Sequence, residues 1–550
     1  MDSFRLFAGI VFAISVFYLV DAWMKEHQPR PAPPPVARPK ENAPGTQNTP
    51  GTSTPETKQP STSAAIPVER AHGQRVIVVT DTLKGEIDTA GGDLRRVELL
   101  KYRDALDSKK NLVLLEDDSE HTYIAQSGVV GRPSSVQGLA YASSQANYEL
   151  SPAQSTLNVR LEATDASGAK VAKIYTFQRG SYVIDIAFEI SSPPGGVLEP
   201  SVYYQLVRDA KPAPGDSKMV PTFLGAEVYT ENDKLRKASF EDIAKNKVDY
   251  PKQASDGWVA IVQHYFLGAW LPPASKTREI FLRAEEGGLY AAGVKIPVGQ
   301  IPSGQTKQVT SRLYVGPQEQ DELRKLAPGL ELTVDYGYLR VIAVPLFWVL
   351  NAIHNFVRNW GVAIILLTVI IKLLFYPLSA ASYKSMARMK VLAPKLQRLK
   401  ERYGDDRQRM HQAMMELYKT EKVNPLGGCL PIVVQIPVFI ALYWVLLLSV
   451  ELRQAPFIFW IQDLSLKDPI YVLPVLMGAT MFIQSSLNPP PPDPVQAKLM
   501  KIMPVAFSIF FFFFPSGLVL YWLVNNVLSI AQQWYITRTL EHGKTARGQA

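Results

Sequence analysis

The stretch Ile364-Ile365-Leu366-Leu367-Thr368-Val369-Ile370-Ile371-Lys372-Leu373-Leu374-Phe375-Tyr376-Pro377 decides the fold class of this chain. It belongs to an apolar segment, 360–378, that is long enough for a helix to cross the hydrocarbon core of a membrane. One basic residue, Lys372, interrupts the segment. Because a charge inside a span is costly, this lysine either extends its amine to the membrane surface or faces a polar cavity. The stretch therefore predicts a membrane protein and marks Lys372 as a candidate functional residue.

Further long apolar runs follow in the C-terminal part of the 550-residue chain. The uncharged run from Ile502 to Thr537 is too long for one span, and Pro515-Ser516-Gly517 divides it into two short helices joined by a turn. We expect core spans at about 360–378, 427–450, 471–487, 502–514 and 517–534. With an apolar N-terminal segment, the α-helical transmembrane bundle then has five core spans and an anchor span.

The N-terminal segment 1–24 contains an apolar run without a small-x-small cleavage pattern after it, so we expect a retained signal-anchor. Residues 25–74 follow with a very different composition. Eleven prolines and no aromatic residue occur between 28 and 67. Such a segment buries too little apolar surface to offset its chain entropy, and it predicts a disordered tether.

Residues 75–334 form short β-rich runs separated by turn residues. Several runs alternate apolar and polar positions, as half-buried antiparallel strands do. Examples are Val76–Thr80, Leu157–Ala163, Lys173–Gln178, Tyr182–Ile190, Val259–Ala269 and Gln308–Val315. The chain has one cysteine, Cys429, so no intrachain disulfide supports this region. We predict one large all-β sandwich domain.

A helix is expected next, at 335–357. Apolar residues recur there at spacings of three and four, which is typical of one apolar helix stripe; they are Leu339, Ile342, Leu346, Val349, Ile353, Phe356 and Trp360. A polar cluster at 354–359 interrupts the hydrophobicity, and one helix from 339 to 378 would be about 60 Å long, twice the membrane core. The pattern predicts an interfacial amphipathic helix followed by a separate span.

The charge of the chain is uneven, and this sets the expected orientation. The net charge is +8, but residues 378–428 alone carry eleven Lys and Arg against five Asp and Glu. Basic loops stay on the cytoplasmic side. Alternation along the spans then places both termini in the cytoplasm and the β domain outside, in the periplasm if the cell has one. The localisation expected is the bacterial inner membrane, with multiple spans.

The basic loop, 379–422, reads as a cytoplasmic helical hairpin. Its first helix has a basic edge, formed by Lys384, Arg388, Lys395, Arg398 and Arg402, and its methionines include Met389, Met410 and Met414. These methionines either pack the two helices together or form an adaptable apolar surface for hydrophobic client segments. In the second interpretation, the basic edge contacts ribosomal RNA or anionic lipid.

The motifs of common enzymes are missing from the sequence. There is no P-loop, no H-E-x-x-H, no G-x-S-x-G and no cysteine pair for a metal. The predicted spans contain no Asp, Glu or His, so no carboxylate there can neutralise Lys372. We expect no enzyme, no catalytic residue, no metal and no cofactor. Polar neighbours for Lys372 are Thr368, Gln435, Gln484, Asn525, Asn526 and Ser529.

These segments also resemble the YidC-type membrane protein insertases in their Gram-negative form. The motifs that carry the resemblance are Tyr376-Pro377-Leu378, Met386-Ala387-Arg388-Met389-Lys390, Glu401-Arg402-Tyr403-Gly404-Asp405-Asp406, Glu421-Lys422-Val423-Asn424-Pro425-Leu426-Gly427-Gly428-Cys429, Val450-Glu451-Leu452-Arg453-Gln454-Ala455-Pro456-Phe457 and Phe514-Pro515-Ser516-Gly517-Leu518-Val519-Leu520-Tyr521. The similarity covers about 335–540 and is weaker over the anchor and the β domain.

The resemblance implies a hydrophilic groove within five core spans, open to the cytoplasm and to lipid. A basic residue of the first core span attracts the hydrophilic part of a nascent chain; Lys372 matches it, where many members have arginine. Thr368, Gln435 and Tyr521 match groove positions, Trp522 stands where some relatives have tyrosine, and Asn525 is a polar neighbour. The external domain would be a β-supersandwich. The implied partners are nascent membrane proteins, the ribosome, the Sec translocon with its accessory subunits and the phospholipid bilayer, but not DNA.

Two other functions remain open from the residues alone. A polytopic solute channel or transporter would use Lys372 as an anion site. A membrane-anchored periplasmic carbohydrate-binding protein would use the β domain. The short paired spans of 502–537 and the large cytoplasmic hairpin favour insertion of membrane proteins over transport.

Overall fold

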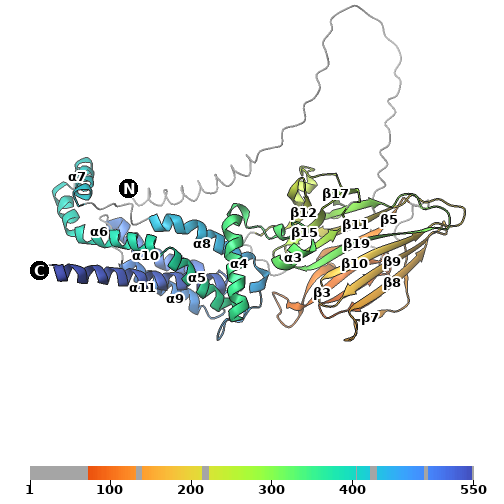
Figure 1. Cartoon of the computed structure of the whole chain (residues 1–550), viewed down its shortest axis with the longest axis horizontal. Coiled ribbons are helices and arrows are strands. Elements are labelled where there is room, and N and C mark those ends of the chain that lie inside the picture. The colour runs from red at the N-terminus through yellow and green to blue at the C-terminus, as the bar shows by residue number, and fades with distance from the viewer. Residues whose placement is uncertain are drawn as a thin grey trace, which may run out of the picture.

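The computed structural model describes residues 72–547, apart from 132–138, 214–221, 275, 404–405, 422–429 and 488–493. A β-rich part comes first, and a helical part follows it along the long axis of the molecule (Figure 1). The expected anchor span, 1–24, and most of the tether, 25–74, lie outside the described residues.

The β domain consists of two large sheets that share one core. The 10-stranded sheet has the order β14-β17-β18-β11-β5-β4-β3-β2-β1-β7, and the 9-stranded sheet has the order β13-β12-β15-β16-β19-β10-β9-β8-β6. The strands are β1 (Arg75–Val79), β2 (Leu83–Asp88), β3 (Asp93–Arg103), β4 (Asn111–Asp117), β5 (Thr122–Val130), β6 (Ala142–Ser143), β7 (Asn147–Glu149), β8 (Thr156–Thr164), β9 (Lys170–Gln178), β10 (Val183–Ser191), β11 (Ser201–Asp209), β12 (Gly225–Thr230), β13 (Lys234–Ser239), β14 (Gln253–Ala254), β15 (Trp258–Gln263), β16 (Phe266–Leu271), β17 (Arg278–Glu285), β18 (Leu289–Pro297) and β19 (Thr306–Pro317). The predicted large β domain is confirmed.

The alternation of buried and exposed residues explains why these segments form strands. In β8, Val159, Leu161 and Ala163 are buried while the residues between them are exposed, so one face of the strand packs into the core. The β-rich run Val259–Ala269 contains two strands. Strands β15 and β16 form a tight hairpin in which Gln263 pairs with Phe266. Both strands are buried along their whole length, and the turn between them is His264-Tyr265.

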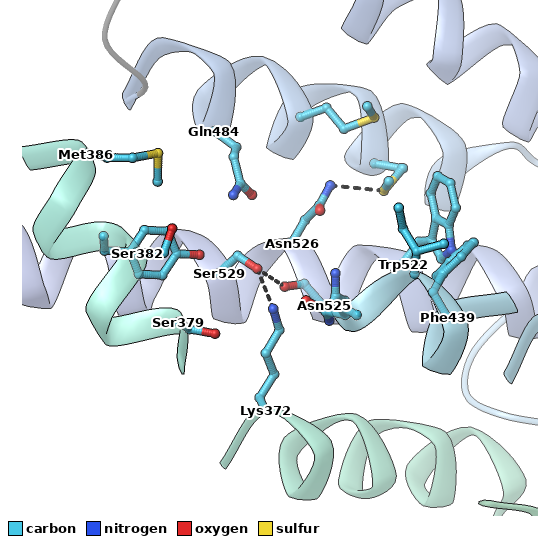
Figure 2. A pocket seen from close by; sticks show the side chains of 15 residues that line it. Lys372, Ser379, Ser382, Met386, Phe439, Gln484, Trp522, Asn525, Asn526 and Ser529 are labelled. Carbon is cyan, nitrogen blue, oxygen red and sulfur yellow. Dashed lines mark hydrogen bonds between the residues drawn. The ribbon is translucent and has the colours of Figure 1, made fainter. Parts of the chain in front are cut away.

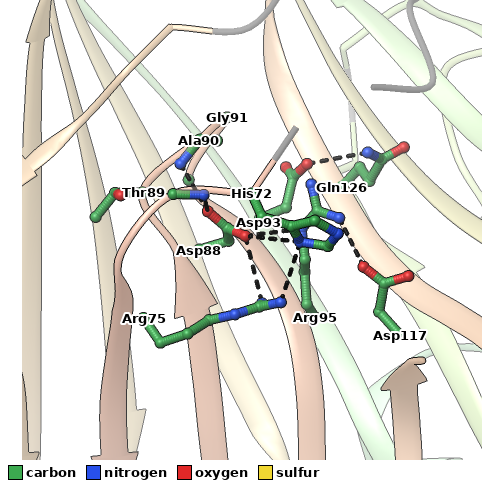
Figure 3. Close-up of polar contacts among 12 residues, drawn as sticks. His72, Arg75, Asp88, Thr89, Ala90, Gly91, Asp93, Arg95, Asp117 and Gln126 are labelled. Carbon is green, nitrogen blue, oxygen red and sulfur yellow. Dashed lines mark hydrogen bonds and ion pairs between the residues drawn. The ribbon is translucent and has the colours of Figure 1, made fainter. Parts of the chain in front are cut away.

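A buried ion-pair network fixes the first strands of the domain (Figure 3). The Asp88 carboxylate is fully buried and lies 3.3 Å from Arg95 and 3.5 Å from Arg75. Arg95 also contacts Asp117, at 2.6 Å. The backbone N–H of Gly73 donates to Asp88 at 2.7 Å. Because these charges neutralise one another inside the sheet, the network is structural.

The β domain ends in α3 (Gln320–Leu326), after the short α2 (Phe240–Ala244), and short 3-10 turns lead into the helical part. Its helices are α4 (Arg340–Val357), α5 (Trp360–Leu374), α6 (Tyr376–Tyr403), α7 (Arg407–Thr420), α8 (Leu430–Leu448), α9 (Val472–Leu487), α10 (Pro494–Phe511) and α11 (Ser516–Arg547). Helices α10 and α11 extend well beyond the expected spans 502–514 and 517–534. Hydrophobicity marks the part of a helix that meets lipid and not where the helix begins or ends.

The expected boundary at 378 between the first core span and the hairpin is also displaced. Helix α5 ends at Leu374, and the chain bends by 66° into α6, which begins at Tyr376. Pro377 explains the bend, because a proline fits the first turn of a helix but disrupts a helix that would continue through it. The bend directs α6 away from the axis of α5.

Helix α4 crosses the bundle near the ends of the other helices, on the side of the β domain (Figure 1). The segment Gly337–Val357 is by itself long and apolar enough to cross a membrane. Its buried residues are Ala343, Phe347 and Leu350. Most of the predicted stripe is half-buried beside them, but Phe356 is 90% exposed. Because α4 is apolar over most of its circumference, periodicity alone did not identify its packed face.

The two parts of the molecule meet at the segment after α8. The Arg453 guanidinium donates to the Arg103 carbonyl at 2.6 Å, and the Gln454 amide donates to the same oxygen at 3.1 Å. His264 lies 3.1 Å from the Leu447 carbonyl. Burial lowers the pKa of His264 to about 4, so the neutral ring donates from Nε2. These contacts join the β domain to the end of α8.

Candidate functional site

Lys372 lies in the last turn of α5 and points into the helical bundle (Figure 2). Only 6% of its surface is exposed. Its ammonium group donates a hydrogen bond of 2.7 Å to the Ser529 hydroxyl of α11. The lysine is thus directed toward a neighbouring helix and not along its own helix toward the membrane surface. Of the two interpretations left open by the sequence, this geometry favours the cavity.

The cavity in front of Lys372 has a volume of about 350 Å³ and lies between α5, α6, α8, α9 and α11. Its polar lining consists of Lys372, Ser379, Ser382, Tyr383, Gln435, Gln484, Asn525, Asn526 and Ser529. None of these residues is acidic, and among the described residues that line the cavity Lys372 is the one with a charge. A cavity of this size and polarity is roomy enough for several water molecules.

Hydrogen bonds between side chains hold the polar wall together. The Gln435 amide of α8 donates to the Asn525 side-chain oxygen of α11 at 3.0 Å. The Asn526 amide approaches the Met477 sulfur of α9 at 3.5 Å. These amides line the cavity, and an amide group can make up to four hydrogen bonds. The wall can therefore solvate a polar chain that enters.

The remaining wall is apolar. It is formed by Met386, Ile436, Phe439, Met477, Met481 and Trp522. The Trp522 ring packs against Phe439, with centroids 4.6 Å apart, and against Phe511, at 4.3 Å. Thioether side chains adapt to varied shapes, so this wall suits apolar segments without a fixed sequence.

The residues predicted for the groove are not all brought together. Lys372, Gln435, Trp522 and Asn525 line the cavity. Thr368 does not; it is 1% exposed and its hydroxyl donates to the Ile364 carbonyl of its own helix at 2.7 Å. Tyr521 is 1% exposed as well and lies in the packed core of the bundle. In this structure these two residues are packed inside the bundle and do not line the cavity.

Sequence reasoning missed the contribution of α6. Ser379, Ser382, Tyr383 and Met386 face the cavity, although they were assigned to the cytoplasmic hairpin. A signal was present, because polar residues separated by three and four positions directly after Pro377 form one helix face. The bend at Phe375 brings this face against α11, and that bend was not expected.

The segment predicted as a hairpin, 379–422, has the expected two helices, α6 and α7. The predicted basic edge is exposed throughout: Lys384, Arg388, Lys395, Arg398 and Arg402. Met389, Met410 and Met414 are half-buried, while Met415 is 43% exposed.

Two polar contacts hold the ends of α7. Lys395 of α6 pairs with Glu421, directly after α7, at 2.5 Å. The Asp406 side chain caps the start of α7 by accepting from the backbone N–H groups of Gln408 and Arg409.

Within the described residues, no group of three or more His, Cys, Asp or Glu side chains is placed to hold a metal ion. The chemistry available at the cavity is therefore that of an ammonium group, amides, hydroxyls and thioethers. Such groups can bind a polar chain that enters the cavity and can solvate it.

Comparison with known proteins shows the family of the chain. Residues 75–349 match the family model of the YidC periplasmic domain, and residues 352–544 match that of the 60Kd inner membrane protein. The chain is 54% identical to the membrane protein insertase YidC of Methylobacillus flagellatus and 51% identical to that of Nitrosospira multiformis, with 98% of each chain covered. The chain belongs to the YidC family of membrane protein insertases. The resemblance seen in the sequence is thereby confirmed, and it extends to the β domain.

Solved structures of lower similarity include other YidC proteins. A crystal structure of active YidC insertase is 18% identical, with a TM-score of 0.41, over 84% of this chain and 93% of that chain. YidC from Thermotoga maritima is 15% identical, with a TM-score of 0.31, over 83% and 99%. A galactose mutarotase related enzyme from Lactobacillus acidophilus is 10% identical, with a TM-score of 0.30, over 44% and 97%.

Proposed function

We propose that this protein inserts membrane proteins into the inner membrane and helps them fold, and that the cavity around Lys372 is its hydrophilic groove. The observation that carries the proposal is a buried lysine that has no carboxylate partner among the described residues, in a cavity lined by amides and hydroxyls from several helices. Family membership supports the same activity. The activity is non-enzymatic.

The energetic barrier to insertion is the hydrophilic part of the client. Moving an unpaired amide or hydroxyl from water into an apolar medium costs about 2–7 kcal/mol. A polar cavity within the membrane lowers that barrier because its side chains replace part of the lost hydration. The apolar segment of the client then moves into lipid, which supplies the driving force at roughly 25 cal/mol per Å² of buried apolar surface.

The charge of Lys372 gives the groove a preference. An acidic residue in the flank of a client is attracted to an ammonium group, and in a site of low polarity this attraction is stronger than in water. The apolar wall around Met386, Met477 and Met481 would accept the adjoining apolar residues. The two walls together suit a segment that is polar at one end and apolar at the other.

In the orientation that we propose, the basic hairpin of α6 and α7 and both chain termini face the cytoplasm, and the β domain faces the periplasm. The exposed basic edge from Lys384 to Arg402 would contact the ribosome or anionic lipid. The protein would act alone or beside the Sec translocon and its accessory subunits, on nascent membrane proteins, in contact with the phospholipid bilayer.

Reconstitution of the purified full chain in liposomes tests this function. A small single-span client is synthesised in the presence of these liposomes or of protein-free liposomes, and insertion is scored by protease protection. In parallel, the liposomes are loaded with a small anion whose release is measured. We expect insertion without release. Release without insertion would indicate a channel or transporter instead.

A further inference from the structure

The hydroxyl of Ser529 donates one hydrogen bond and accepts another. Ser529 is 5% exposed on α11. Its Oγ–H donates to the Asn525 carbonyl one turn earlier, at 2.7 Å. A hydroxyl has one proton and two lone pairs, so both lone pairs are left to accept. One of them accepts from the ammonium of Lys372 at 2.7 Å.

Ser529 therefore connects two helices. It accepts from Lys372 of α5 and donates to the Asn525 carbonyl of its own helix, α11. Lys372 and Ser529 lie together at one wall of the cavity (Figure 2).

Lys372 needs such a partner because its side chain is long and flexible. The residue lies two positions before the end of α5, and a lysine stem is long enough to carry the amine out of the cavity toward a polar surface. Within the described part of the chain, Ser529 is the one hydrogen-bond partner of the ammonium group. Its hydroxyl thus selects the conformation in which the charge faces the groove.

We propose that Ser529 is a positioning residue, which holds the ammonium group of Lys372 in the groove. The proposal rests on the insertase function. It assigns to one serine the preference of the groove for acidic clients.

The test compares Ser529→Ala with Ser529→Thr in the full chain in liposomes. Two clients are used that differ only in an acidic or an uncharged hydrophilic tail, and the ratio of their insertion rates is measured. A hydrogen bond to a charged group is strong enough that we expect the acidic-to-neutral ratio to fall about tenfold in Ser529→Ala. Threonine keeps the hydroxyl and the bond to the carbonyl one turn earlier, so Ser529→Thr should retain the ratio.

A second measurement reports how accessible the Lys372 amine is. The rate at which a membrane-impermeant amine reagent modifies Lys372 is measured by mass spectrometry of the peptide that contains it. Loss of the anchoring hydroxyl should raise this rate several-fold in Ser529→Ala. Ser508→Ala is the matched control, because that hydroxyl donates to the Pro474 carbonyl and lies outside the cavity lining.

The outcomes separate this inference from the insertase function. If the wild-type chain inserts both clients while Ser529→Ala keeps the ratio and the labelling rate, Ser529 has no positioning role. If Ser529→Ala slows both clients equally and Ser508→Ala does the same, the effect is general destabilisation and the inference is wrong. If the wild-type chain inserts neither client, the proposed function itself fails.

Discussion

Each of the two parts of the molecule buries a lysine, and the two lysines have different contacts. In the β domain, Lys173 is fully buried and donates to the Ser127 carbonyl at 2.9 Å, with the Asp93 carboxylate 3.7 Å away. In the bundle, Lys372 has a serine hydroxyl as its partner and a cavity in front of it. Burial disfavours the charged form of each group. It lowers the pKa of Lys173 to about 8 and raises the pKa of Asp93.

The difference teaches how to tell a structural charge from a functional one. A buried charge that is paired and surrounded by carbonyl groups has no capacity left for a ligand, and it is part of the fold. A buried charge that faces a polar cavity without a counter-ion retains its attraction for an external group. By this criterion Lys173 supports the sandwich, and we propose that Lys372 serves the client.

The largest effect predicted from this comparison is on stability. Lys173→Ala leaves the Asp93 carboxylate buried without its partner, and we expect it to lower the free energy of unfolding by about 3–5 kcal/mol. Lys372→Ala removes a charge that is solvated in a cavity, so the same measurement should change far less. Denaturant unfolding of the full chain in detergent, followed by tryptophan fluorescence, measures both.

The double variant Lys173→Met with Asp93→Asn sharpens this comparison. It removes both charges while it keeps similar side-chain volumes, so most of the lost stability should return. If the double variant is as unstable as Lys173→Ala, the packing of the lysine stem and not the ion pair would be the cause. Equal losses in Lys173→Ala and Lys372→Ala would remove the distinction between the two lysines.

A smaller effect is expected where the two parts meet. The Glu451 Oε2 atom is buried without a hydrogen-bond partner, and burial raises the pKa of Glu451 to about 8, helped by the nearby Glu319 and Asp321. Between the unfolded value near 4.5 and this folded value, the folded state binds a proton that the unfolded state lacks. Stability from this group is therefore complete below about pH 4.5 and is lost as pH rises toward 8.

The variant Glu451→Gln tests this effect. Its thermal unfolding temperature should fall less than that of the wild-type chain between pH 6.5 and pH 8, a window that lies above the titration of His264. The matched variant Glu319→Gln should reduce the fall only slightly, because Glu319 acts on Glu451 from a distance. An identical fall in Glu451→Gln and in the wild-type chain would show that Glu451 is ionised in the folded protein.

The sequence predicted features that depend on local composition and failed on those that depend on distant contacts. Hydrophobic runs located the helices α5, α8 and α9 within a few residues, and the charge of 378–428 identified the hairpin. The run Val259–Ala269 is apolar apart from Gln263 and His264, and it forms parts of two strands, β15 and β16, both of which are buried.

At the site, Lys372 was identified because a charge among apolar residues is conspicuous. Its partner Ser529 was one of several polar residues on other helices, and only the packing of α11 against α5 and α6 selects it. Thr368 and Tyr521 were expected in the groove, but helix rotation turns them into the packed core. Rotation and packing depend on contacts between helices far apart in the chain, which no local pattern reports.

The central claim is that Lys372 lowers the barrier for the hydrophilic flank of a client. The most direct measurement is the ratio of insertion rates for clients with an acidic and an uncharged tail, in liposomes that contain the wild-type chain, Lys372→Ala or Lys372→Arg. We predict a ratio about tenfold lower in Lys372→Ala, which corresponds to about 1.4 kcal/mol, and a ratio in Lys372→Arg at least equal to that of the wild-type chain. An unchanged ratio in Lys372→Ala, with both clients still inserted, would contradict the account.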